Sequence, residues 1–119
     1  MPAPEIIDLH SLFATPSDDG WTPSAKGVER RVRLNLPEMM VVEFRFEAGA
    51  VGAPHAHPHV QSSFVREGTF DVTIAGATKR LGAGGGFIVP GGFEHGVVAV
   101  ERGLLIDVFT PRREDFLLV

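Results

Sequence analysis

The sequence contains no cysteine, which excludes a disulfide framework and any thiolate metal site. A metal ion would therefore have to bind histidine, carboxylate or amide side chains. Basic residues are also in the minority: 11 Lys and Arg against 15 Asp and Glu give a formal charge of −4, which speaks against a general affinity for nucleic acid or for an anionic membrane. No apolar run is long enough to cross a bilayer, and residues 1–12 lack the basic start and apolar core of a signal peptide, so we expect a cytoplasmic protein.

A helical period is missing as well, throughout residues 28–109. Instead, 14 glycines and nine prolines separate short runs that are rich in Val and Phe. This pattern predicts an all-β domain, either a sandwich or a barrel, and 119 residues leave room for one core. The predicted strands cover residues 32–36, 39–46, 60–66, 70–75, 79–81, 87–89, 97–100 and 104–109.

The two ends of the chain differ from this β-rich middle. Residues 1–27 form a predicted irregular arm, because four prolines interrupt any long helix. The barrel is predicted over residues 28–119 and ends in a short helix over residues 111–116, with Thr110 as its cap and Pro111 in its first position. Several apolar side chains predict that the arm packs against the barrel or a partner subunit: Ile6, Ile7, Leu9, Leu12 and Phe13.

Three histidines form the candidate metal site. His55 and His57 are separated by one residue, and alternate side chains of a strand point to the same face. Pro58 interrupts the ladder, so the chain is expected to turn there, and His95 follows a tight turn at residues 90–92. The three imidazoles can converge on one ion; the alternative is three polar residues satisfied by hydrogen bonds at the mouth of a barrel.

These residues resemble the two motifs of the cupin superfamily. The first has Gly, five residues, His-x-His, an acidic ligand and a final Gly; the second has Gly, five residues, Pro-x-Gly, two residues and His. This chain carries Gln61 where most cupins carry Glu, so Gln61 is either a direct metal ligand or a hydrogen-bond donor just outside the ligand shell. The resemblance implies a double-stranded β-helix, or jelly-roll barrel. The matching positions are Gly49, His55, His57, Gln61, Gly68, Gly84, Pro90, Gly92 and His95.

Three imidazoles and one amide narrow the range of suitable metal ions and favour a substrate of one charge, but they do not identify the metal. Imidazole suits Zn, Ni, Fe and, less well, Mn, so we expect one divalent ion of this group. Neutral donors leave the full charge of the ion in place, which favours an anionic substrate, and four protein ligands leave positions open for it. His59 beside Pro58 and the isolated His10 are expected to lie at the surface or outside the ligand shell.

The last predicted strand carries a carboxylate within an apolar run. Alternation places Leu105, Asp107 and Phe109 on one face. A buried carboxylate is costly unless it is paired, hydrogen-bonded or protonated, so Asp107 is either a general acid/base beside the metal or part of an ion pair, with Arg113 as a partner. Phe109 is either core packing or a pocket wall. Arg113 is either a surface charge or a carboxylate-binding group.

The same segments resemble the KdgF-type cupins of pectin degradation, which carry His-x-His-Pro-His-x-Gln and, near the end, Asp-Val-Phe-Ser-Pro-x-Arg-Glu-Asp. Residues 55–61 and 107–115 match, with Thr110 in place of Ser. The resemblance implies ring opening of 4,5-unsaturated monouronates to linear keto acids. It implies that metal binds to His55, His57, Gln61 and His95, and that Asp107, Phe109 and Arg113 act on the substrate.

Two other functions fit the sequence, a metal-dependent dioxygenase and a cupin that only binds a sugar or small acid. An enzyme is favoured over a binding module. In each case the expected partner is a small acidic molecule, above all a sugar acid. Small cupins commonly pair through their sheets, and the strand over residues 104–109 is apolar on both faces, so we also expect a homodimer.

Overall fold

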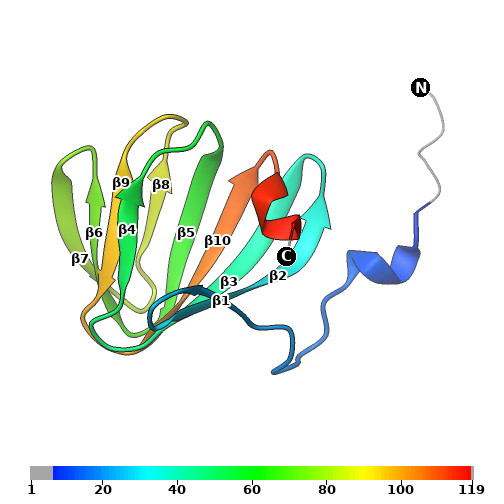
Figure 1. The fold of residues 1–119 in the computed structure, drawn as a ribbon, viewed down its shortest axis with the longest axis horizontal. Helices are drawn as coiled ribbons and strands as arrows, with labels where there is room; N and C mark the ends of the chain where they lie inside the picture. Colours follow the sequence, from blue (N-terminus) through cyan, green and yellow to red (C-terminus); the bar gives the residue numbers. More distant parts are fainter. Residues whose placement is uncertain (1–6, 119) are drawn as a thin grey trace.

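Ten β-strands make up nearly all of the regular structure in the part of the chain that the computed structural model describes, residues 7–118 (Figure 1). They form two antiparallel sheets, one of six strands in the order β1-β2-β3-β10-β5-β8 and one of four in the order β4-β9-β6-β7. This is the predicted all-β jelly-roll architecture. The strands are β1 (Thr22–Ala25), β2 (Val28–Leu36), β3 (Met39–Phe46), β4 (Val51–His55), β5 (Val60–Glu67), β6 (Thr69–Ile74), β7 (Ala77–Gly82), β8 (Gly86–Val89), β9 (His95–Ala99) and β10 (Gly103–Thr110).

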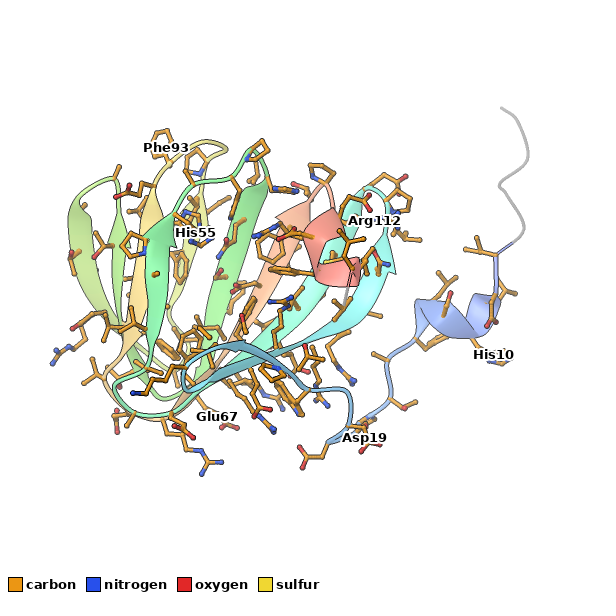
Figure 2. The ribbon with its side chains drawn as sticks, in the orientation of Figure 1. His10, Asp19, His55, Glu67, Phe93 and Arg112 are labelled. Carbon is orange, nitrogen blue, oxygen red and sulfur yellow. The ribbon has the colours of Figure 1, made fainter. Side chains whose placement is uncertain are left out.

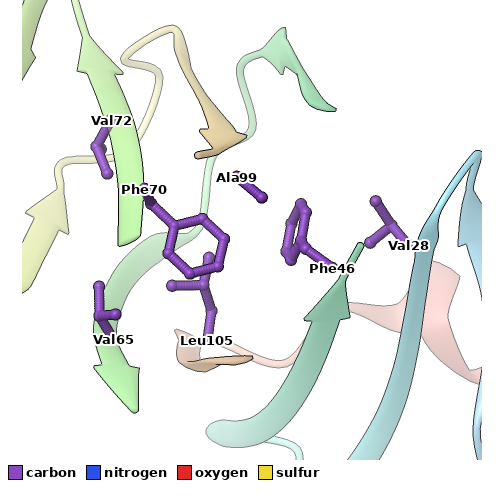
Figure 3. Close-up of a cluster of buried hydrophobic side chains, with 7 residues drawn as sticks. All are labelled: Val28, Phe46, Val65, Phe70, Val72, Ala99 and Leu105. Carbon is purple, nitrogen blue, oxygen red and sulfur yellow. The ribbon is translucent and has the colours of Figure 1, made fainter. Parts of the chain in front are cut away.

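The main apolar core lies between the two sheets (Figure 3). Its centre is Phe70 of β6, which is fully buried and meets the ring of Phe46 edge-on, with the ring centroids 5.2 Å apart. Burying a large apolar side chain of this kind stabilises a fold by about 1.5–3 kcal/mol. The full cluster contains Val28, Phe46, Val65, Phe70, Val72, Ala99 and Leu105.

Strand β10 runs through the middle of the larger sheet, between β3 and β5. Its side chains alternate strictly between buried and half-buried positions, so Leu105, Asp107 and Phe109 all face the interior, as the sequence predicts. Asp107 lies opposite Val42 on one side and Ser63 on the other. The fold therefore places a carboxyl group inside the barrel, flanked by two central strands.

The predicted C-terminal helix over residues 111–116 is wrong: the structure has only a 3-10 turn, η2 (Glu114–Leu117). Thr110 is the last residue of β10 rather than a helix cap. The backbone N–H of Arg112 donates to the carbonyl of Pro37 at 3.2 Å, which holds this part of the chain against the β2–β3 turn. Arg113, at the cap position, has an extended backbone and makes no side-chain capping bond.

The N-terminal segment leads away from the barrel (Figure 1). It contains one 3-10 turn, η1 (Leu9–Leu12), and then β1, which pairs with β2 as an edge strand. Arg31 and Arg33 of β2 fasten the intervening chain by donating to the carbonyls of Thr15, Ser17 and Asp19. The side chains of Leu9 and Phe13 are exposed, and Ile6 lies outside the described residues. None of the described helices combines the length and apolar character needed to cross a bilayer.

Candidate metal centre

The three predicted imidazoles come from two neighbouring strands and the loop after one of them. His55 is the last residue of β4 and pairs with His95, the first residue of β9. His57 lies two residues beyond the end of β4, not on the strand as the alternation argument assumed, yet its ring still turns toward the other two. One nitrogen from each ring lies within 4.8 Å of the others. Figure 2 shows His55 at the end of the barrel opposite Glu67.

The three histidines differ in how far they are buried. The side chains of His57 and His95 are buried, whereas His55 is exposed. Ring centroids are 4.5 Å apart for His55 and His95, and 4.7 Å apart for His57 and His95. The site is therefore closed on the side of the barrel interior and open to solvent on the side of His55.

Backbone carbonyls fix the tautomer of all three rings. The Nδ1 atom of His55 lies 3.0 Å from the carbonyl of Ala53, that of His57 lies 3.1 Å from the carbonyl of His59, and that of His95 lies 2.9 Å from the carbonyl of Phe93. A carbonyl oxygen only accepts, so each Nδ1 carries the proton and each Nε2 of the neutral ring presents a lone pair. Outer hydrogen bonds of this kind orient metal-binding histidines. The ring of His59 is thus not part of the triad, but the backbone carbonyl of His59 orients the ring of His57.

Gln61 of β5 brings a fourth donor to the same point. Its Oε1 lies 3.1 Å from the Nε2 of His57 and 3.1 Å from the Nε2 of His95. Its amide nitrogen donates to the Ser63 hydroxyl at 3.0 Å and to Oδ2 of Asp107 at 3.3 Å. The reversed amide would turn its oxygen toward an ionised Asp107, so the carboxylate favours the orientation in which Oε1 faces the histidines.

These donors fit a divalent cation. An amide oxygen and two imidazole lone pairs at 3.1 Å repel one another unless a positive charge lies among them. Ligand atoms about 2.1 Å from a common ion are about 3.0–3.4 Å apart when their bonds to it meet at 90–109°. The two distances from Gln61 Oε1 to the histidine nitrogens fall in that range. The chain thus has a histidine triad able to hold a metal ion, with Gln61 positioned to join it.

Burial shifts the pKa values of the site in two directions. It favours neutral rings at His57 and His95, and it favours the protonated form of Asp107 more than in a free carboxyl group. Burial lowers the pKa of His57 and of His95, which favours the form that binds metal. Burial also raises the pKa of Asp107 to about 7, against the opposing effects of the Ser63 hydroxyl and the charge of Arg113. Within residues 7–118, Oδ1 of Asp107 is buried without a hydrogen-bond partner.

A cavity of about 410 Å³ connects the triad to the other predicted site residues. Phe109 is buried in its wall, 5.8 Å from the ring of His57 and 5.7 Å from that of Phe116, so it is at once core packing and pocket lining. Arg113 binds Asp115 through two parallel bonds of 3.0 and 2.8 Å, and is not the partner of Asp107. The residues lining the cavity include His55, Gln61, His95, Asp107, Phe109 and Arg113.

Sequence reasoning overlooked two polar residues of this cavity region. Ser63 is buried and links Gln61 to the neighbourhood of Asp107; its inward position follows from the alternation Gln61, Ser63, Val65 along β5. Arg30 lines the cavity from β2, where it alternates with the apolar Val28 and Val32. For Ser63 the alternation with Gln61 already indicates the inward position, whereas for Arg30 the pairing with Phe44 shows which face of β2 it occupies.

Comparison with known proteins places this fold and site in one class. Residues 42–109 match the Cupin_2 (cupin domain) family, so the chain belongs to the cupins. Over 99 residues it is 37% identical to the pectin degradation protein KdgF of Dickeya dadantii strain 3937, an alignment that spans 82% of this chain and 90% of the relative. The predicted membership of the cupins and the resemblance to the KdgF type are confirmed.

Two solved structures are similar over most of their length. KdgF from Halomonas sp. superposes with a TM-score of 0.84 at 38% identity, over 87% of this chain and 96% of the other. An RmlC-like cupin from Shewanella frigidimarina NCIMB 400 gives the same TM-score at 40% identity, over 87% of this chain and 94% of the other. The chain is thus a KdgF homologue along nearly its whole barrel.

Proposed function

We propose that this cupin opens the ring of 4,5-unsaturated monouronates and converts them to linear keto acids. The relationship to KdgF, a pectin degradation protein, supports this substrate class. The observation that supports the chemistry most directly is the position of Asp107: a carboxyl group with a raised pKa joined through Gln61 to the histidine triad, within one cavity.

The proposed reaction is an isomerisation and needs no redox partner. Ring opening breaks the bond between the anomeric carbon and the ring oxygen; the anomeric hydroxyl gives up its proton and the ring oxygen gains one. The result is an aldehyde and an enol. The enol then loses its O–H proton while the adjacent carbon gains one, which leaves a ketone, so the product has the composition of the substrate.

Each residue has a proposed part in this reaction. Asp107 accepts and returns the proton, since a carboxyl group with a pKa of about 7 exchanges protons readily near neutral pH. Phe109 and Arg113 contact the substrate from the wall of the cavity. His55, His57, Gln61 and His95 hold one divalent ion, which we propose is Zn, Ni, Fe or Mn. When bound, the ion supplies Lewis-acid stabilisation of the negative charge that develops on substrate oxygen.

The test is an assay with the unsaturated monouronates released by pectate and alginate lyases. Metal-loaded wild-type protein should remove the double-bond absorbance well above the uncatalysed rate, and chelation followed by metal replacement should abolish and restore this activity. A wild-type rate equal to the uncatalysed rate contradicts the proposal. The two other functions separate in the same experiment, because a dioxygenase consumes oxygen and a binding module retains its ligand without changing it.

We also propose a homodimer that forms through the outer face of the six-stranded sheet. Phe64 of β5 and Ile88 of β8 lie on this face with more than half of their side-chain surface exposed. Arg31, Arg33 and Arg66 surround a single carboxylate there, that of Glu43. Within the N-terminal segment, residues 15–19 already accept hydrogen bonds from Arg31 and Arg33 of the same chain, whereas residues 7–13 carry Asp8 but neither Lys nor Arg and expose apolar side chains. The charge and apolar surface of residues 7–13 therefore complement this face of a second copy.

Light scattering at low protein concentration tests the dimer. In a two-fold interface Phe64→Glu brings like charges together, so this variant should have the mass of a monomer. Val98→Glu, a matched change at an exposed position of β9 in the other sheet, should leave the mass unchanged. A monomeric wild type, or a Phe64→Glu variant with the mass of a dimer, contradicts the proposed interface. The cytoplasmic location stays a prediction.

A further inference from the structure

Arg30 differs from the other arginines of its region in the direction that it faces. Along β2, Arg31 and Arg33 point outward and both contact the carboxylate of Glu43, at 2.9 and 3.1 Å. Arg30 has the opposite parity, pairs with Phe44 in the sheet and lines the cavity of the metal centre. An arginine at an inward position between Val28 and Val32 calls for a reason.

Arg30 is held in place but not neutralised. Its guanidinium carbon lies 4.2 Å from the centroid of the Phe116 ring, and its Nη1 donates to the Ser24 hydroxyl at 3.2 Å. Within the described residues no carboxylate lies within salt-bridge distance of it. A guanidinium has five N–H donors, so most of those on Arg30 are available to a ligand.

Arg113, the other arginine of the cavity, is paired with a carboxylate. Its Nε and Nη2 bind both oxygens of Asp115, which occupies the edge that best matches a carboxylate and cancels the charge. Both oxygens of Asp115 are bound by Arg113, and Asp115 acts on the charge of Arg30 only from beyond salt-bridge distance. Of the two cavity arginines, Arg30 is therefore the one without a salt-bridge partner among the described residues.

From this contrast we infer that Arg30 binds the carboxylate of the acidic substrate and so determines the preference of the cavity for acids over neutral sugars. The inference rests on the proposed function in so far as it takes the ligand to be an acidic sugar. The aromatic ring of Phe116 and the Ser24 hydroxyl fix the guanidinium plane before the ligand arrives, which lowers the entropy lost on binding. Arg113 is left to contact the substrate through its remaining N–H groups.

The test compares two unreactive ligands that differ only at carbon 6, galacturonate and galactose, by calorimetry on zinc-loaded protein. Wild type should bind galacturonate more tightly than galactose, and Arg30→Gln should reduce this preference about 10- to 100-fold, the effect of losing a hydrogen bond to a charged group. Arg30→Lys should restore part of it. Arg80→Gln, which removes the same charge from exposed β7, should keep the wild-type preference.

Two further measurements complete the design. In the ring-opening assay Arg30→Gln should raise KM about 10-fold or more. Because the carboxylate is bonded to carbon 5, next to both the ring oxygen and the double bond, its loss of position should also lower kcat, but by a smaller factor. Asp115→Asn releases the guanidinium of Arg113, so this variant should keep or increase the preference for galacturonate. No wild-type preference for galacturonate, or one that survives in Arg30→Gln, overturns the assignment; so does a loss that appears only in Arg113→Gln.

The calorimetric comparison of galacturonate and galactose does not require turnover. The proposed reaction and the proposed carboxylate site can therefore be disproved independently of each other. If wild type leaves unsaturated uronates unchanged but prefers galacturonate through Arg30, the proposed reaction is wrong and the carboxylate site stands. If ring opening occurs and the preference is insensitive to Arg30, the reaction stands and the carboxylate site is wrong.

Discussion

The two ends of the barrel are built from the same strands and have opposite chemistry. At the closed end, β5 contributes Val65 and β10 contributes Leu105 to a dry core around Phe70. Further along the same two strands, toward the open end where the cavity lies, the inward-facing residues are polar. They are Gln61 on β5 and Asp107 on β10. The strands continue without a break, so only the identity of the inward residue changes.

This contrast shows that the polar groups of the candidate site lie away from the centre of the main core. The two regions still meet, because Val28, Phe46 and Leu105 of that core also line the cavity, and a second apolar cluster lies beside the site: Met40, Val42 and Phe109. Apolar burial at the closed end drives folding, whereas a buried polar group costs free energy unless its hydrogen bonds are satisfied. Asp107 has one buried oxygen without a partner, and Gln61 faces two lone pairs. Asp107 and Gln61 therefore cost free energy in the metal-free protein, and variants of Asp107 and of the core around Phe70 should behave in opposite ways.

The largest expected effect is that of Asp107→Asn at the open end. The variant keeps the shape of the side chain but removes its proton chemistry, so kcat for unsaturated uronates should fall about 10²- to 10⁴-fold. Because a buried carboxyl group disappears, the free energy of unfolding should stay the same or increase, as measured by urea denaturation of the metal-free protein. Activity within about 3-fold of wild type, or a clear loss of stability, would show that Asp107 is structural.

Phe70→Ala at the closed end should do the reverse. Truncation of a fully buried phenylalanine should lower the free energy of unfolding by about 3–5 kcal/mol, through lost burial and the cavity left behind. The folded variant should retain ring-opening activity per molecule. It should also keep the stabilisation by zinc, about 4 kcal/mol for free ion at 1,000 times its dissociation constant. Val98→Ala, at an exposed position, is the control. Loss of the zinc effect in Phe70→Ala would mean that the two ends are coupled.

The closed end was largely predictable from the sequence, since alternation and glycine turns depend on local chemistry. Strands β3 and β5 to β10 and the inward face of β10 follow from these signals, whereas β1 (Thr22–Ala25), which lies in the predicted irregular arm, and β4 (Val51–His55) were not among the predicted strands. What the sequence missed depends on tertiary contacts. Only a 3-10 turn forms at Glu114–Leu117 because the backbone of Arg113 is extended (φ −80°, ψ 98°) in the middle of the predicted helix, and the preceding residue is held by a bond from its N–H to Pro37, far away in the chain.

The residues of the candidate site were predictable from the sequence, but the hydrogen bonds and ion pairs between them were not. Motif resemblance named the three histidines and Gln61. It gave no indication that Gln61 would link the triad to Asp107, nor that Asp115 would occupy Arg113, because such pairings depend on which side chains meet across a barrel. Arg30 was missed for a different reason, since an arginine among outward arginines on one strand looks like surface charge until register assigns its face.

A smaller effect at the closed end comes from the β5–β6 turn. Gly68 and Gly76 both have left-handed backbones, with φ of 82° and 86°, so alanine is strained at each. A Cβ atom at Gly68 would overlap the carbonyl oxygen of Arg102, while one at Gly76 would meet nothing within 4 Å. Gly68→Ala should therefore destabilise the protein by about 1–3 kcal/mol more than Gly76→Ala, measured by urea denaturation. Equal losses would mean that the backbones there move apart easily.

The smallest expected effect is at the rim of the open end, where Arg113 and Asp115 form an exposed ion pair. The Arg113 guanidinium holds the pKa of Asp115 below its ordinary value. A carboxyl group with a depressed folded-state pKa adds stability above its unfolded pKa, near 3.9, and loses it as the pH falls through the folded value. Solvent screening limits this contribution to about 0–1 kcal/mol.

Asp115→Asn should thus lower the free energy of unfolding slightly at pH 7, with the difference from wild type vanishing as the pH falls from about 4 through the lowered folded-state pKa of Asp115. Thermal unfolding of metal-free protein across this range measures it, and Asp71→Asn, which breaks the comparable Asp71–Arg80 pair far from the cavity, is the matched control. A loss well above that of the control at pH 7 would mean that the rim pair holds the C-terminal turn over the cavity, since Phe116 of that turn packs on Phe109 and under Arg30. In that case the open end would contribute to stability as well as to chemistry, and the division between the two ends would not be complete.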